Sequence, residues 1–102
     1  MLESLESELM KLGASKVKKL NQRECTILVA ELRNSVYLIA AYKYGLTDNY
    51  VCKILPSTKV LNWNCIELEY NPHGLYVLAS SEEELINKAI KKLQLIMKAD
   101  WI

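Results

Sequence analysis

Val36-Tyr37-Leu38-Ile39-Ala40-Ala41 has a close counterpart in Leu75-Tyr76-Val77-Leu78-Ala79-Ser80, which begins thirty-nine residues later. Each stretch follows a turn signal and consists mainly of leucine, tyrosine and β-branched or small side chains. Such runs are typical of a buried strand that leaves a hairpin. The pair predicts that one small structural unit occurs twice in this chain.

The first unit is expected to hold one helix and three strands, over about residues 2–45. Leucines at helical spacing, followed by Gly13, predict a helix over residues 2–12. An Arg33–Asn34 turn is expected between the last two strands, because asparagine tolerates a positive φ. The three predicted strands are Ser15–Leu20, Cys25–Leu32 and Val36–Ala41, the last continuing towards Gly45.

The second unit, about residues 46–80, is expected to repeat the same order. Thr47 can cap a helix and Pro56 would stop it, so a helix of about two turns is predicted between them. A turn at Asn71–Gly74 has proline at its second position and glycine at its fourth. The three strands predicted for this unit are Ser57–Asn62, Cys65–Tyr70 and Leu75–Ser80.

The most regular pattern lies near the end of the chain and predicts a closing helix, about residues 81–98. Ser81 and Glu84 have the spacing of a capping box, and one wide apolar stripe runs through residues 82–98. The predicted fold class is therefore α+β in a single domain, 1–102. It consists of two αβββ pseudo-repeats plus a C-terminal helix (α-βββ-α-βββ-α), with antiparallel meanders packed against helices.

Composition and charge limit the classes of function. The formal net charge is +1, so no overall field attracts the chain to nucleic acid or to an anionic membrane. No apolar run is long enough to cross a bilayer, and acidic residues stand where a signal peptide would be positive. We therefore expect a soluble, intracellular protein. Since no glycine-rich phosphate loop is present, we also expect a non-enzyme without cofactors.

Three cysteines and one histidine raise the question of a metal or thiol site. Cys25, Cys52, Cys65 and His73 lack the close paired spacing of zinc ligands. Cys25 and Cys65 are expected at equivalent strand positions, where buried thiols are favoured over a disulfide and over a metal. A cysteine nucleophile with His73 as its base is disfavoured, because a histidine in a turn is expected to be solvated.

The predicted function is a non-enzymatic protein–protein interaction module that binds a partner or an extended peptide in a groove between the repeats. Strand edges beside such a groove offer unpaired backbone groups to an added strand. Ile27 and Val29 are apolar where Glu67 and Glu69 stand in the second unit, so a partner or the rest of the chain should cover them. Candidate partner-binding residues are these two and four amphipathic aromatics: Tyr42, Tyr44, Trp63 and Tyr76. A homodimer is an open alternative.

The alternative function is that of a nucleic-acid-binding accessory protein. Its candidate residues form the one local basic cluster together with a lysine at the matching position of the second unit: Lys16, Lys18, Lys19, Arg23 and Lys59. Helix–three strands–helix is also the order of double-stranded-RNA-binding domains, and a duplicated αβββ unit is similar to saddle-shaped minor-groove binders. The near-neutral charge and the glutamates of the second unit favour a protein partner instead.

The chain is small, rich in lysine, glutamate and tyrosine, free of phenylalanine, and built in two halves on Val36–Ala41 and Leu75–Ser80. In these respects it resembles the small orphan proteins of viruses that infect hyperthermophilic archaea, of the Acidianus filamentous virus type. The resemblance covers the whole chain and rests on no diagnostic motif. It implies an accessory viral protein in the cytoplasm of the host cell, with an interaction role rather than a metabolic one.

Overall fold

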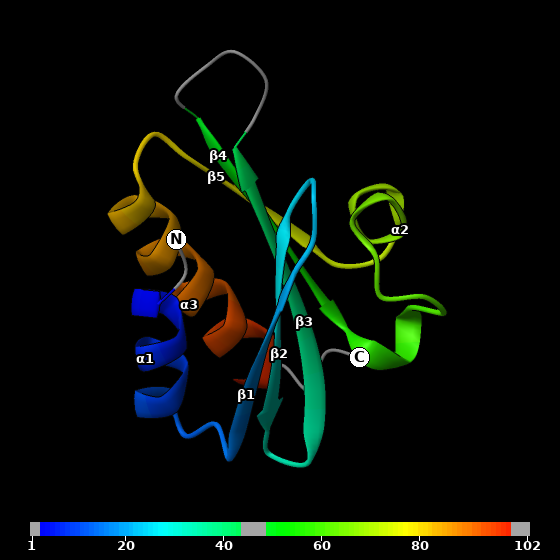
Figure 1. The fold of residues 1–102 in the computed structure, drawn as a ribbon. Coiled ribbons are helices and arrows are strands. Elements are labelled where there is room, and N and C mark those ends of the chain that lie inside the picture. Colours follow the sequence, from blue (N-terminus) through cyan, green and yellow to red (C-terminus); the bar gives the residue numbers. More distant parts are fainter. Residues whose placement is uncertain (1–2, 44–48, 99–102) are drawn as a thin grey trace.

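A five-stranded antiparallel sheet forms the centre of the protein (Figure 1). The structure is a computed structural model that describes residues 3–43 and 49–98. The strands lie in chain order across the sheet: β1 (Lys16–Asn21), β2 (Thr26–Leu32), β3 (Ser35–Lys43), β4 (Tyr50–Pro56) and β5 (Leu75–Ala79). Every neighbouring pair is antiparallel, so β1 and β5 are the two edge strands.

Helices cover both faces of the sheet. Figure 1 shows α1 (Glu3–Leu12) and α3 (Glu82–Lys98) on one face and the short α2 (Cys65–Tyr70) on the other. A single 3₁₀ turn, η1 (Ser57–Lys59), follows β4 and begins the connection to α2. The protein therefore has three layers. None of its described helices is both long and apolar enough to cross a membrane.

Strand alternation divides the apolar side chains between two cores. The larger core lies under α1 and α3, where helix residues such as Leu5, Leu9 and Leu93 meet the inward side chains of the strands. The smaller core lies under α2, whose Leu68 is fully buried against Leu38 and its neighbours. Residues 37–41 of β3 and 51–56 of β4 are thus buried on both faces of the sheet.

The predicted elements at the two ends of the chain are confirmed. The structure contains the first helix, the first three strands, the strand after the Asn71–Gly74 turn and the closing helix. Arg33 and Asn34 have φ of 50° and 65°, which is the left-handed geometry that a two-residue hairpin loop requires. Ser81 caps α3, since its Oγ accepts from the Glu84 N–H at 3.1 Å. The α+β class is correct.

The middle of the chain differs from the prediction. The helix expected between Thr47 and Pro56 is wrong: Tyr50–Pro56 is β4, and Thr47 lies outside the described residues. Six of its seven residues are buried, because a central strand is covered on both faces. The strand expected at Ser57–Asn62 is also wrong, since only η1 forms there and Val60 enters the smaller core.

The strand expected at Cys65–Tyr70 is α2 instead. Its N-cap is Asn64, whose Oδ1 accepts from the Glu67 N–H at 2.8 Å. Cys65 and Leu68, three residues apart, both turn inward, as a helix requires. The second half therefore contains strand, helix and strand rather than helix and three strands. The observed element order departs from the predicted αβββ repeat there.

Candidate functional site

A groove of about 860 Å³ opens where the last turn of α2 meets the β5 side of the sheet. Its walls come from the ends of β3 and β4, from α2, from β5 and from the start of α3. The lining residues are mostly apolar or aromatic, with two carboxylates: Tyr42, Asn49, Val51, Glu69, Tyr70, Tyr76, Leu78, Ala79, Ser80 and Glu84. An apolar hollow with a few polar groups is the common form of a binding site.

Strand alternation on β5 explains why the groove is apolar. Val77 and Ala79 point into the larger core, so Tyr76 and Leu78 point to the α2 side. The sheet face there extends beyond the six-residue α2, which leaves Tyr76 at 51% and Leu78 at 64% exposure. Large apolar side chains with this exposure, gathered in one hollow, are typical of an interaction surface.

A buried lysine fixes the C-terminal end of α2 above the sheet. Lys53 is 1% exposed, and its Nζ donates to the Asn71 carbonyl at 2.6 Å, just beyond the helix. The same Nζ lies 4.0 Å from the ring centroid of Tyr76, a cation–π contact. The Tyr76 hydroxyl donates to the Glu69 carbonyl, so the ring links β5 with α2. Of the residues in this network, Tyr76 and Glu69 line the groove.

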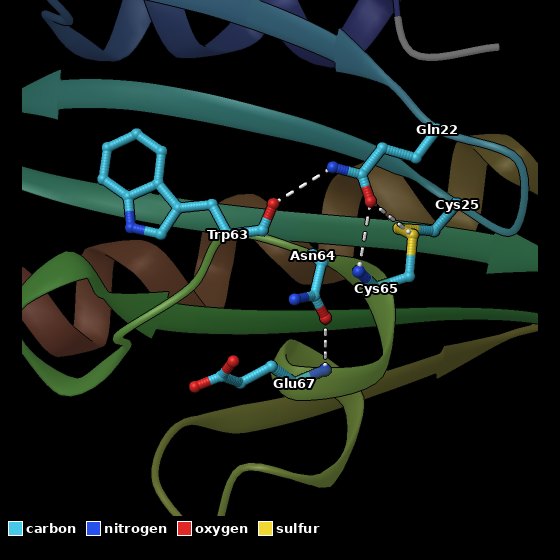
Figure 2. Close-up of a disulfide and its surroundings, with 6 residues drawn as sticks. All are labelled: Gln22, Cys25, Trp63, Asn64, Cys65 and Glu67. Carbon is cyan, nitrogen blue, oxygen red and sulfur yellow. Dashed lines mark hydrogen bonds between the residues drawn. A yellow bond between two sulfur atoms is a disulfide. The ribbon is translucent and has the colours of Figure 1, made fainter.

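A disulfide fixes the N-terminal end of α2 (Figure 2). Cys25, just before β2, bonds to Cys65, the first residue of α2. Beside it, Gln22 Nε2 donates to the Trp63 carbonyl at 3.0 Å and Gln22 Oε1 accepts from the Cys65 N–H at 3.2 Å. Cys25 and Cys65 are buried, as predicted, but they form the disulfide over which free thiols were favoured. They were expected on equivalent strands, whereas α2 crosses the sheet face and brings Cys65 above Cys25.

None of the described strands pairs with the outer edge of β5, which lies beside the groove. In the antiparallel ladder alternate residues turn their backbone groups to β4, and the rest turn theirs outward. Lys88 of α3 donates to the Leu78 carbonyl at 2.9 Å, so the backbone groups of Leu78, and by alternation those of Tyr76, face outward. The side chains and the outward backbone groups of these two residues therefore belong to one continuous surface.

Tyr42 and Glu69 form the polar corner of the groove. Tyr42 comes from the end of β3, and Glu69 comes from the last turn of α2. Burial, reinforced by the neighbouring Glu69 carboxylate, raises the pKa of the Tyr42 hydroxyl above its usual range. The hydroxyl therefore stays protonated and can donate to the carboxylate.

The groove contains two of the six candidate partner-binding residues, Tyr42 and Tyr76. Trp63 is exposed on the segment before α2 and does not line the groove, and Tyr44 lies outside the described residues. Ile27 is fully buried in the smaller core, which Val29 joins as a half-buried neighbour. The chain itself, through α2, covers the apolar face on which these two residues lie.

The candidate basic residues do not form one surface. Lys16 and Lys18 point to the α2 side of β1, whereas Lys19 points to the opposite side and lies 3.3 Å from Glu3 of α1. Arg23 follows β1, and Lys59 lies across the sheet in η1. The cluster seen in the sequence is thus divided between the two faces of an edge strand.

Most of the residues that line the groove were not among the candidates from the sequence: Asn49, Val51, Glu69, Tyr70, Leu78, Ala79, Ser80 and Glu84. The placement of Glu69 and Tyr70 depends on α2, which was predicted as a strand. The signal that could have located it is Asn64 three residues before Glu67, the spacing of a helix N-cap. No group of three or more metal-ligating side chains occurs within residues 3–43 and 49–98. His73 is exposed in the turn before β5.

Comparison with known proteins identifies no relative: no family model, no curated protein sequence and no solved structure matches the chain.

Proposed function

We propose that this protein binds an extended segment of a partner protein along the outer edge of β5, with side chains of that segment entering the groove. The observation that carries the proposal is the joint exposure of Tyr76 and Leu78. Their side chains line the groove, and their backbone groups face the free edge of the sheet. Lys88 already occupies the Leu78 carbonyl, so an added strand would pair with the other outward backbone groups, among them the Leu78 N–H, and would bury the side chains.

The two edges of the sheet support the choice of β5. β1 carries three lysines, and lysine on an edge strand opposes pairing with another chain. β5 carries no charged residue and has a hollow beside it. The lysines of β1 therefore oppose pairing with a partner strand, whereas the uncharged edge of β5 allows it.

The test uses a random heptapeptide library displayed on phage, selected against the whole protein. Leu78→Pro removes an outward N–H without removing a bond to β4, so the variant should fold. We expect selected peptides to bind this variant about fivefold more weakly or worse, because it loses one hydrogen bond of about 1 kcal/mol together with the Leu78 side-chain contact in the groove. Lys16→Ala with Lys18→Ala, on the other edge, is the matched control and should bind normally.

Amide exchange in the wild-type protein provides a second measurement. Bound peptide should slow hydrogen exchange at Tyr76 and Leu78 and leave β1 unchanged. Failure of any peptide to enrich, or equal binding to wild type and Leu78→Pro without protection of β5, would overturn the proposal. Retention on heparin that disappears with salt and with the two β1 lysine substitutions would favour nucleic acid instead.

A further inference from the structure

Glu69 and two tyrosines mark one corner of the groove as a distinct subsite. A smaller hollow of about 290 Å³ adjoins the groove, and both are lined by Tyr42, Glu69 and Tyr70. These three side chains therefore lie where the two hollows meet. A ligand side chain entering there would contact a carboxylate and two aromatic rings together.

The charge at this corner is not balanced within the described chain. The groove has two carboxylates, and that of Glu84 already lies 3.0 Å from the Lys88 ammonium. The Glu69 carboxylate has the neutral Tyr42 hydroxyl beside it. Among the described residues no lysine, arginine or histidine nitrogen lies within 4.0 Å of it. A half-buried carboxylate beside aromatic rings favours a cationic partner, because water compensates its charge only in part.

The tyrosine rings add to the preference for a cation. Tyr70 is 77% exposed at the end of α2, so its ring is accessible to a ligand. The ammonium of Lys53 on Tyr76 is an example of the same contact within this protein. An ammonium or guanidinium group close to a tyrosine ring gains about 0.5–2 kcal/mol, more as it loses water.

The apolar part of the groove favours a cation with an apolar stem over an inorganic ion. Leu78 is well exposed and lines the same groove as Glu69, with the buried Val51 behind it. Lysine and arginine place an apolar stem on such a surface and keep the charged group at its end. An inorganic cation would leave this apolar surface uncovered, and Glu69 alone would not complete its coordination.

We infer that the corner formed by Tyr42, Glu69 and Tyr70 receives a lysine or arginine side chain of the bound segment. The inference rests on the proposed function and specifies the chemistry that its ligand carries. A basic side chain enters from the β5 edge, its stem lies on Leu78, and its charged group reaches Glu69.

The test begins with the same heptapeptide selection. Enriched peptides should share a lysine or arginine at one fixed position. A synthetic lysine-containing peptide from the selection is then compared with its norleucine analogue, which has the same stem and no charge. We expect wild-type protein to bind the lysine peptide about tenfold more tightly. Glu69→Gln should reduce that ratio to about twofold or less.

Glu67→Gln is the matched control, because it makes the same change on the same helix at a residue outside the groove. It should leave the tenfold ratio unchanged. Selected peptides that depend on the β5 edge but carry no common basic residue would overturn this inference and leave the proposed function standing. An equal lysine preference in wild type and Glu69→Gln would overturn it as well. A selection that yields no peptide at all would overturn the proposed function, and this inference with it.

Discussion

Lys53 and Tyr76 face each other across the β4–β5 ladder, with the lysine ammonium 4.0 Å from the centre of the tyrosine ring. The ring continues to the Glu69 carbonyl, and the ammonium reaches the Asn71 carbonyl. One cross-strand pair thus bonds to two backbone positions around the end of α2. A short helix gains little from its own hydrogen bonds, so these external bonds hold it in place.

Packing of the Lys53 stem should matter more to stability than its charge. Lys53→Met keeps most of the buried volume and removes the cost of burying an ion, so we expect a change within about 1 kcal/mol. Lys53→Ala leaves a void under Tyr76 and should cost about 2–4 kcal/mol. Urea unfolding of the two variants measures both values. Equal losses of unfolding free energy in Lys53→Met and Lys53→Ala would show that the ammonium contacts contribute more than the stem.

The Cys25–Cys65 bond should be a major contribution to stability. It closes a loop with a sequence separation of 40, for which the entropic model gives about 4 kcal/mol. Reduction should therefore lower the melting temperature by roughly 15–30 °C. The Cys25→Ala, Cys65→Ala double variant is the control, and it should melt at the same temperature with or without reductant. Wild type whose melting is unchanged after verified reduction would contradict the prediction.

Alanine substitutions at two glycines should distinguish the cost of backbone strain from the cost of a steric clash. Gly13 and Gly74 both have positive φ, of 112° and 95°. A Cβ at Gly13 meets nothing within 4 Å, whereas a Cβ at Gly74 would lie 2.5 Å from the Ile54 carbonyl oxygen. We expect Gly13→Ala to cost about 1–2 kcal/mol and Gly74→Ala roughly 3 kcal/mol or more, by urea unfolding. Similar losses would mean that β4 shifts freely away from the turn.

Alkaline pH should destabilise the fold through Cys52. Burial raises the pKa of the Cys52 thiol from its ordinary value of 9.0 to about 12. The unfolded chain therefore loses this proton first, so the stabilisation is complete below pH 9 and is lost as the pH rises towards 12. Cys52→Ala should show a shallower decline in free energy of unfolding over that range, although it starts from a lower value. Identical slopes would contradict the prediction.

The parts of the fold that could be predicted from sequence have local signals. α1 and α3 show an apolar stripe at helical spacing, and Ser81 caps α3. The β2–β3 hairpin has Arg33–Asn34 at its turn. Each of these patterns depends on residues that are close in the chain, so a single sequence suffices to read it.

β4 and α2 could not be predicted because their patterns depend on distant contacts. β4 is buried on both faces, so it lacks the alternation of a half-exposed strand, and Lys53 interrupts its apolar run. α2 has six residues, too few for helical spacing to differ from alternation. Its covering of Ile27 and the position of Glu69 in the groove follow from that one assignment, which is why the candidate site was only partly foreseen.

The difference between the two edge strands, β1 and β5, also limits how many copies of the protein could join into one sheet. Suppose that two copies were to join through β5, each supplying the strand that the other accepts. Both outer margins of the combined sheet would then be β1, with its lysines Lys16, Lys18 and Lys19. Those margins would repel a third copy, so self-association by this route would stop at a pair and could not propagate into a fibre.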